Sequence, residues 1–409
     1  MKRINIDKIQ PGMILGRDVA NREGRRLLSK DMMLTSKEIR ILKMWGIPEV
    51  IIHQDPAAEI SLQPEAATKD DKTARVFLDA WFTNNDCKNP VIKAVYDICL
   101  DRHLNDQFEL FSVFQADQDL EAFKSYQIRP LEEIRNLLKK DLKLPSLPTI
   151  FSEINEASQN PQCSGKDIAG IVSKDTSLSA TLLKIVNSAY YGLPEKVESL
   201  QYAAMALGTQ QLSSLALGIT VVDYFKGIAN LQMNMESFWR HSIASGIAAK
   251  TLASQIKGVN SERVFVSSLL HDIGWLVFLN FCPNECNQVV YKARLLGLNL
   301  YQVEPRYFGM THARFGSLLV KNWNFPDNIA SLIDQHHDNF KTLPSKEVAI
   351  VYVANWLVDA IGIGFAGEKE MARLSMNAWK ALELSESVLA SIVKQIDRQV
   401  AETIKFFYE

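Results

Sequence analysis

Hydrophobic positions in the second half of the chain follow a helical period almost throughout. Leu147, Ile150, Phe151 and Ile154 lie at i, i+3, i+4 and i+7, directly after a proline-rich entry at 144–148. The same period, with polar residues at the expected starts, predicts further helices at 168–172, from Asp175 or Thr176 to 187–189, at 199–208 and from 209 onward. No alternation typical of strands interrupts them, so we expect a multi-helix domain at 137–345, followed by C-terminal helices at 346–409.

The first 53 residues follow another pattern. A turn at 10–13 leads into a strand predicted at 13–20, and residues 21–24 have hairpin chemistry. A capping box at 35–38 opens a helix that Gly46 and Pro48 end, and 50–52 form a closing strand. The fold class predicted is therefore mainly α, with a small β-rich α+β module at 1–53.

Residues 54–136 are expected to join these two parts. Residues 54–72 have no apolar period and are predicted to form a linker. Two helices are expected between 73 and 102, separated by a break at 84–90, and 103–124 are interpreted as irregular or helical. The segment is thus a linker followed by a helical connector.

Composition limits the partners and the cellular location expected for this protein. With 409 residues, 47% of them hydrophobic, and a net charge of −2, nothing in the overall charge attracts nucleic acid or an anionic membrane. The start becomes polar too soon for a signal peptide. The most apolar run, 348–367, is about long enough to cross a bilayer, but it contains Asn355 and Asp359, so we interpret it as a buried helix. The five cysteines form no disulfide or zinc-finger pattern, as is usual in a reducing cytoplasm. Taken together, these features predict a cytoplasmic protein without a membrane span or a nucleic-acid partner.

Candidate chemistry is concentrated around Ser268-Leu269-Leu270-His271-Asp272-Ile273-Gly274. A His-Asp pair at the end of an apolar run needs a compensating partner when it is buried, and a metal ion is one such partner. Five of the seven histidines lie between 241 and 337: His271 at the end of the apolar run, and His241, His312, His336 and His337 on apolar faces of predicted helices. A single histidine in such a place is usually a hydrogen-bonded core residue, but five of them beside an aspartate suit zinc, iron or manganese.

Linked motifs in the helical part resemble those of the HDOD domain (HD-related output domain), an all-helical bacterial signalling module. The motifs are Leu144-Pro145-Ser146-Leu147-Pro148, Lys174-Asp175-x-x-Leu178-x-x-x-Leu182-Leu183, Val186-Asn187-Ser188-Ala189, Ala203-x-x-x-Leu207-Gly208, Phe238-Trp239-Arg240-His241-Ser242 and Trp323-x-Phe325-Pro326. The resemblance covers about 137–345. It implies a bacterial signal-transduction protein that works with a protein partner of a signalling pathway.

Residues 1–53 resemble the small N-terminal domain of HD-GYP phosphodiesterases, through Ile9-Gln10-Pro11-Gly12-Met13 and Gly46-Ile47-x-x-Val50-x-Ile52. The histidine order also resembles that of these enzymes, which hydrolyse cyclic di-GMP at a centre of two or three metals. The resemblance implies the ligands His241, His271, Asp272, His312, His336 and His337, with Asp272 as the bridging carboxylate. Glu304 is interpreted as a helix-end carboxylate, with an extra ligand or an acceptor for a ring N–H as alternatives.

Four departures argue against such an enzyme. Trp275 stands where the enzymes have a lysine for phosphate, Asn355 stands where they have their last aspartate ligand, and Ser237 stands where some have a metal-binding glutamate. The Gly-Tyr-Pro segment that names these enzymes is replaced by residues 338–341. Asp359, one turn after Asn355, is a candidate substitute for the missing aspartate ligand.

These departures predict a regulatory protein with little or no catalytic activity. It is expected to bind a protein partner or a small ligand, such as a nucleotide or cyclic dinucleotide, with a divalent metal (Fe, Mn or Zn) in the cluster. The alternatives are a metal-dependent phosphohydrolase of cyclic dinucleotides and a metal-free structural scaffold.

Overall fold

The computed structural model divides the chain into two compact units, residues 1–68 and 69–409, and each is described by itself. The structure describes residues 2–5, 13, 15–20, 26–28, 30, 32, 34, 42, 49–52, 71–105, 109–112, 129–136, 148–187, 191, 193, 195–225, 235–366 and 370–408.

The described part of the first unit contains four short strands: β1 (Lys2–Asn5), β2 (Val19–Ala20), β3 (Arg26–Leu28) and β4 (Glu49–Ile52). β1 pairs with β4 and β2 with β3, both antiparallel, around a small core that includes Leu15, Val50 and Ile52. The closing strand was predicted. β1 was not, because its four residues show no alternation by themselves. The predicted hairpin residues 21–24 and most of the helix expected after residue 35 lie outside the described residues.

The second unit begins with two connector helices, α2 (Asp71–Trp81) and α3 (Pro90–Leu104). Asn89 caps α3 by accepting a hydrogen bond from the Val91 N–H at 3.0 Å, and Pro90 occupies the first helical position. After α3 comes β5 (Glu109–Ser112), which pairs in parallel with β6 (Ile363–Ala366). The interpretation of 103–124 as irregular or helical is therefore wrong for 109–112, since its strand depends on a partner far along the chain.

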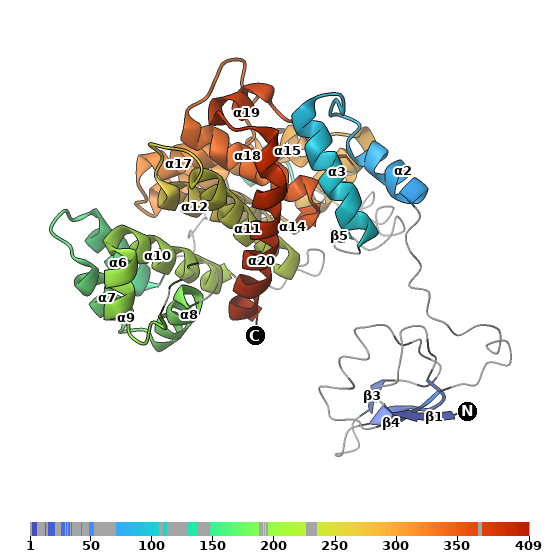
Figure 1. Cartoon of the computed structure of the whole chain (residues 1–409), viewed down its shortest axis with the longest axis horizontal. Coiled ribbons are helices and arrows are strands. Elements are labelled where there is room, and N and C mark those ends of the chain that lie inside the picture. The colour runs from blue at the N-terminus through green and yellow to red at the C-terminus, as the bar shows by residue number, and fades with distance from the viewer. Residues whose placement is uncertain are drawn as a thin grey trace. The chain divides into compact units, whose positions relative to one another are not determined.

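The helices that the apolar period predicted after residue 144 are present: α6 (Thr149–Gln159), α7 (Gly165–Val172), α8 (Thr176–Val186), α9 (Leu200–Leu207) and α10 (Thr209–Phe225). Asp175 caps α8 by accepting from the Leu178 N–H at 3.0 Å. Gly208, with φ +85°, ends α9. These helices and the others of this unit confirm the mainly α fold class (Figure 1).

The remaining described helices are α5 (Leu131–Asn136), α11 (Met235–Ala253), α12 (Ser261–Leu269), α13 (Ile273–Phe281), α14 (Pro283–Leu296), α15 (Leu300–Phe308), α16 (His312–Asn322), α17 (Asp327–Asp334), α18 (Lys346–Ala360), α19 (Met376–Leu382), the single turn η3 (Glu386–Val388) and α20 (Leu389–Tyr408).

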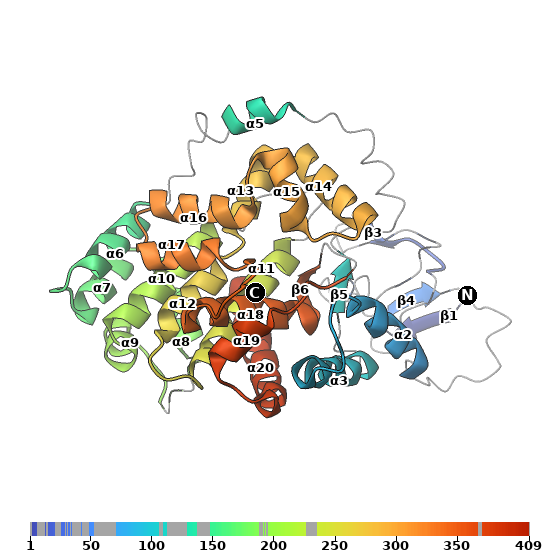
Figure 2. The ribbon, with the colours of Figure 1, turned by 90° about the horizontal axis from the view of Figure 1, so that it is seen from above.

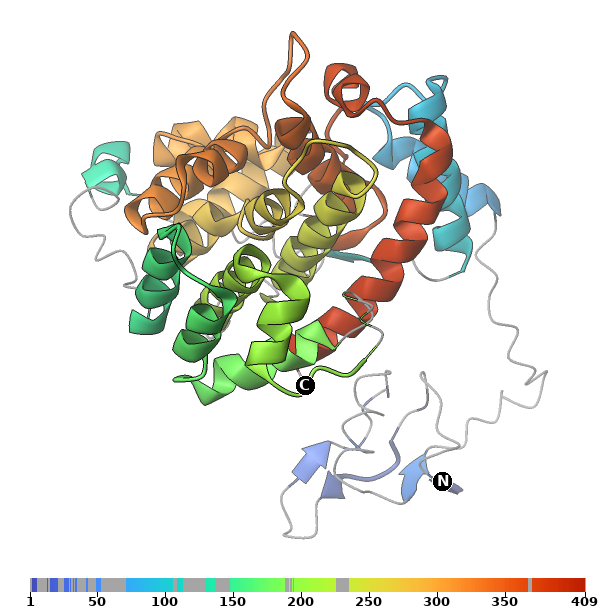
Figure 3. The same cartoon turned by 60° about the vertical axis from the view of Figure 1, so that its left-hand side comes forward.

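Helix α11 occupies the centre of this unit. It packs against α12, α18 and β6, and the β5–β6 pair lies beside it (Figure 2). The long helix α20 crosses α11 and also contacts α3 and α8, so it ties the connector to the helical core (Figure 3). Arg102 adds a specific link, because its Nε donates to the Ile361 carbonyl at 3.0 Å and its Nη1 pairs with Asp397.

Two apolar stretches are buried inside the fold. Residues 261–281, which form α12 and α13, are long and apolar enough to cross a bilayer by length and composition, but 89% of that window is buried within the protein. The run 348–367 forms α18, whose described apolar side chains are almost all buried, and then β6. The expected buried helix thus ends at Ala360, and a strand follows it.

Candidate metal centre

The turn between α12 and α13 carries His271 and Asp272 into the middle of the helical unit. Gly274 makes this position available, because a Cβ at that residue would overlap the backbone carbonyl oxygen of His312. A Cβ at Gly316 would lie 3.3 Å from the Gly274 nitrogen, which is a tight contact. The first turn of α13 therefore packs backbone to backbone against α16. This contact brings the Asp272 carboxylate to the His312 ring.

A second glycine positions His241, which lies in α11. Gly364 in β6 has φ +94°, and a Cβ there would overlap the Cα and Cβ of His241. Only glycine permits both this backbone conformation and this close approach. Strand β6 therefore closes the site against α11.

Asp272 lies between two groups of imidazoles. Its Oδ2 is 3.2 Å from Nε2 of His271 and 3.7 Å from Nε2 of His241. Its Oδ1 is 3.1 Å from Nε2 of His312 and 3.5 Å from Nε2 of His336. Each carboxylate oxygen thus faces a different pair of rings, which is the arrangement of a carboxylate that could bridge two cations.

The outer ring nitrogens of three of these histidines are already hydrogen-bonded. Nδ1 of His271 lies 2.6 Å from the Ser268 carbonyl, and Nδ1 of His336 lies 2.6 Å from the Ile333 carbonyl. Nδ1 of His312 lies 2.7 Å from Oε1 of Glu304. Since carbonyl and carboxylate oxygens only accept, these Nδ1 atoms carry protons, and in the neutral ring Nε2 presents a lone pair to the cluster.

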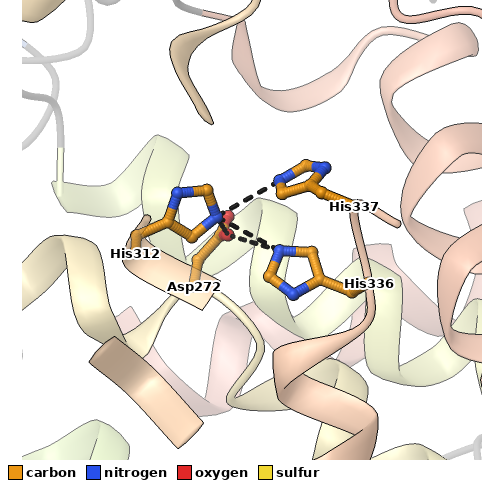
Figure 4. Close-up of side chains that lie close together, drawn as sticks. All are labelled: Asp272, His312, His336 and His337. Atoms are coloured by element: carbon orange, nitrogen blue, oxygen red, sulfur yellow. Dashed lines mark hydrogen bonds and ion pairs between the residues drawn. The ribbon is translucent and has the colours of Figure 1, made fainter. Parts of the chain in front are cut away.

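The inward nitrogens lie close to one another, and Figure 4 shows those of His312, His336 and His337 around Asp272. The Nε2–Nε2 distances are 3.2 Å for His241–His271, 3.1 Å for His312–His336 and 3.2 Å for His337–His312. Ligands about 2.0–2.1 Å from a shared ion lie roughly 3.0–3.4 Å apart, so these separations fit metal binding. Two groups could hold an ion: Asp272 with His312, His336 and His337, and Asp272 with His241 and His271.

The electrostatics of the cluster are dominated by burial and by Asp272. Burial, followed by the neighbouring His271, lowers the pKa of His241 to about 4, and burial lowers the pKa of His336 to about 4. Burial and the rings of His336 and His312 hold the pKa of His337 well below its usual value. The pKa of Asp272 also falls well below its usual value, because the surrounding imidazoles outweigh its burial.

His312 differs from the other rings. Burial opposes its charged form, but Glu304 on one side and Asp272 on the other outweigh that effect and raise the pKa of His312 to about 10. Without a cation, His312 is therefore a charged ring held between two carboxylates. The positive charge of His312 thus compensates the buried carboxylates of Glu304 and Asp272 in the metal-free chain as well.

The structure divides the secondary candidates into two groups. Oδ1 of Asn355 lies 3.1 Å from Nε2 of His271, so this amide belongs to the inner set. Glu304 and Asp359 lie behind the rings instead: Glu304 accepts from the His312 backbone N–H at 2.7 Å, and Asp359 lies 3.5 Å from Nδ1 of His241. Both are placed as outer partners that orient a ring.

Trp275 occupies the position of the absent lysine. Its side chain is 2% exposed and packs among aromatic rings, with Phe278, Phe308 and His312 at centroid distances of 6.3, 6.4 and 6.0 Å. Ser237 is buried on α11, one turn before His241. Neither residue supplies a cation or a carboxylate to the cluster.

The sequence did not indicate two backbone contacts that orient the rings. The carbonyls of Ser268 and Ile333 each orient the histidine three residues further on, at the end of α12 and of α17. A histidine just after a helix end is the signal that could have revealed this contact, because the last carbonyls of a helix lack intrahelical partners.

The helical unit that holds this His/Asp cluster has the HDOD-like helical fold. Residues 144–339 match the family model of the HDOD domain, so the chain contains an HDOD domain. The HDOD assignment from the sequence motifs is thereby confirmed. The resemblance of residues 1–53 to the N-terminal domain of HD-GYP phosphodiesterases stays a prediction.

Solved structures share the fold. An HDOD domain protein of unknown function from Geobacter sulfurreducens is 26% identical, with a TM-score of 0.58, over 68% of this chain and 100% of that one. A putative phosphohydrolase from Shewanella amazonensis is 23% identical, with a TM-score of 0.53, over 66% of this chain and 97% of that one. A putative signal transduction protein from Marinobacter aquaeolei is 20% identical, with a TM-score of 0.53, over 72% of this chain and 66% of that one.

One uncharacterized protein of Treponema pallidum is 25% identical over 199 residues. The match covers 48% of this chain and 38% of the Treponema protein, so the two share a domain and not their whole length.

Proposed function

We propose that this chain is a cytoplasmic bacterial signal-transduction protein whose HDOD domain is a regulated binding module with a divalent metal in its His/Asp cluster. One observation carries the metal part of the proposal. The Nε2 atoms of His312 and His336 lie 3.1 Å apart although both Nδ1 atoms already face acceptors. In the metal-free chain the single Nε2 proton of a charged His312 can serve only one of three neighbours, Nε2 of His336, Nε2 of His337 and Oδ1 of Asp272, whereas a cation would be shared by all of them.

The donors suit iron, manganese or zinc. His312, His336 and His337 with Asp272 would hold one ion, and His241, His271 and the Asn355 amide with Asp272 would hold a second. A bound ion would supply a Lewis acid for an oxyanion of the ligand. The protein itself orients the rings, through the Ser268 and Ile333 carbonyls and through Glu304.

We propose binding without turnover because the groups that would hold a phosphate during hydrolysis are missing from these positions. The residue three after Asp272, where the enzymes have a lysine for phosphate, is the buried Trp275. On α18 the neutral Asn355 replaces an aspartate ligand, which leaves the centre with one negative charge fewer. The protein then acts by binding a small ligand or a protein partner of a signalling pathway, and the metal organises the site.

A metal-dependent phosphohydrolase is the second candidate, and one observation favours it: the two oxygens of Asp272 face separate groups of rings, as a two-metal mechanism requires. The metal-free scaffold is the third. It is favoured by the position of His312 between Glu304 and Asp272, which is stable without an ion.

Metal analysis by mass spectrometry tests the proposal, on protein purified without an affinity tag or chelator. We expect one or two equivalents of iron, manganese or zinc, and their loss in the His271→Ala/Asp272→Ala double variant. His103→Ala is the matched control, because this ring stacks on Phe77 outside the cluster. A metal-free wild type would refute the proposal in favour of the scaffold, and turnover of cyclic dinucleotides by the loaded protein would replace it with the hydrolase.

A further inference from the structure

A cleft of about 610 Å³ adjoins the His/Asp cluster. Three segments form its walls: the start of α15, residues 337–340 after α17, and residues 372–377, which lead into the first turn of α19. This volume lies within the range of small-molecule sites, which is about 300–1,000 Å³. Its position beside the cluster, together with this size, makes it a candidate ligand site.

His337 joins the cleft to the cluster. Its Nε2 is 3.2 Å from Nε2 of His312, and its ring stacks on Tyr301 at a centroid distance of 4.5 Å and an interplanar angle of 14°. Both His337 and Tyr301 line the cleft. A molecule bound there therefore lies next to the inner donor set.

The loop that forms the opposite wall is held in place before any ligand arrives. The Tyr352 hydroxyl donates to the Arg373 carbonyl at 3.0 Å and accepts from the Ser375 N–H at 2.9 Å. The Asn377 amide donates to the Phe340 carbonyl at 2.9 Å and so links two walls. A wall fixed in this way costs little conformational entropy when a ligand binds.

The connector holds the same loop from the other side. The Asn85 side chain donates to the Ala372 carbonyl at 3.1 Å and accepts from the Leu374 N–H at 2.9 Å. Trp356 of α18 donates to the same Ala372 carbonyl at 2.9 Å. The wall is therefore anchored to both the connector and the helical core.

The lining indicates the chemical class of the ligand. Arg373 is exposed in the cleft, and its guanidinium has no ion-pair partner among the described residues. Tyr301, Phe340 and Tyr352 give the cleft an aromatic lining, in which His337 covers one face of the Tyr301 ring, and Asn339 and Gln302 add amides. A free guanidinium selects an anionic oxygen group, aromatic faces select a planar ring, and amides hydrogen-bond its edge.

We infer that this cleft binds a small anionic molecule that carries a planar, hydrogen-bonding ring, with its anionic group on Arg373 and its ring on the Tyr301 wall. Asp338, on the segment after α17, supplies an acceptor for a donor of the ring. The inference rests on the proposed ligand-binding role of the domain, but not on the presence of a metal.

Isothermal titration calorimetry on the full chain tests this inference. The probes are nucleoside monophosphates of all four bases, nicotinate as an aromatic carboxylate, and inorganic phosphate without a ring. We expect one equivalent of a ring-bearing anion to bind, and the probe that binds distinguishes phosphate from carboxylate as the anionic group. Arg373→Gln should weaken that binding about tenfold or more, because a charge-assisted hydrogen bond is lost. Tyr301→Leu, which keeps the bulk without the ring, should weaken it as well.

The matched control is Arg306→Gln, which removes an exposed arginine of α15 that does not line the cleft. Its binding should stay within about twofold of wild type. Absence of binding by every probe, equal losses in Arg373→Gln and Arg306→Gln, or binding of inorganic phosphate as tight as that of any ring-bearing probe would each overturn the inference.

Metal content, measured on the same samples, separates this test from that of the proposed function. If the chain is metal-free and still binds a probe, the cleft assignment stands and the metal part of the proposed function is refuted. A metal-loaded chain that binds none of the probes keeps the metal and refutes the cleft assignment.

Discussion

Glu304 accepts two hydrogen bonds from a single residue, the backbone N–H of His312 at 2.7 Å and Nδ1 of its ring at 2.7 Å. The carboxylate is 0% exposed, so it holds both the start of α16 and the orientation of the ring. Because an outer acceptor of this kind raises the basicity of a metal-binding imidazole, Glu304 is expected to control metal affinity without touching the ion.

Replacement of this carboxylate gives the first prediction. Glu304→Gln should lower metal affinity about tenfold to a hundredfold, since outer acceptors usually have effects of this size. Competition with a coloured chelator measures the affinity. Glu285→Gln, a buried carboxylate outside the cluster, is the control and should leave metal affinity unchanged. Equal affinity in Glu304→Gln and wild type would remove this role from Glu304.

Metal removal gives the second prediction. A ligand that binds only the folded state at a hundred to a thousand times its Kd stabilises by about 3–4 kcal/mol. Dialysis against a chelator should therefore lower the melting temperature of the wild type, as measured by differential scanning calorimetry. The His271→Ala/Asp272→Ala variant should show no further decrease with chelator. A chelator effect of the same size in both proteins would mean that the ion binds elsewhere.

The third prediction concerns pH. Burial alone would raise the pKa of Glu285, but hydrogen bonds from Arg129, at 3.0 Å to Nη2 and 2.9 Å to the backbone N–H, outweigh it and hold the pKa below its usual value. A group with a lowered pKa in the folded state adds stability above its unfolded pKa, and this stability is lost as pH falls through the folded pKa.

The wild type should accordingly exceed Glu285→Gln in the free energy of unfolding by about 1–3 kcal/mol near neutral pH, because the variant leaves Arg129 without its charged partner. The difference should shrink as the pH is lowered below 4.5, the ordinary value for this carboxyl. Urea unfolding at a series of pH values measures it. A difference that is constant down to the acid transition would contradict the assignment of this ion pair.

Two helical glycines give the fourth prediction. Gly274→Ala should destabilise the fold by about 1–3 kcal/mol or more, because the added Cβ overlaps the His312 carbonyl and forces α13 away from α16. It should also reduce metal loading, since Asp272 and His312 separate. Gly170→Ala, where nothing lies within 4 Å of the new Cβ, should instead stabilise by about 0.5–1 kcal/mol. Thermal unfolding and metal analysis of both variants check this pair.

The connector gives the fifth prediction. Asn85→Ala removes the two hydrogen bonds to the cleft wall, and it should cost about 1–3 kcal/mol and speed amide exchange at residues 372–375. Asn105→Ala, which removes an exposed amide at the end of α3, serves as the control. Hydrogen exchange followed by mass spectrometry measures the effect, and equal exchange in the two variants would show that the connector does not hold this wall.

The sequence by itself determined the elements whose signals are local. Asp175, Ser199 and Gly208 mark the ends of α8 and α9 because a side chain or a positive φ satisfies the helix terminus within a few residues. The apolar period likewise identified the helical unit, the quoted motifs resembled those of the HDOD domain, and the sequence singled out all five histidines that the structure brings together around Asp272.

Tertiary structure decided everything that depends on a distant partner. Residues 109–112 form a strand only because β6 lies beside them, and residues 363–366 leave the expected helix for the same reason. The inner place of Asn355 and the outer places of Glu304 and Asp359 follow from how α11, α16 and α18 cross, which no local pattern records. The cleft beside His337 is likewise a product of packing, because its walls come from segments that meet only in the folded chain.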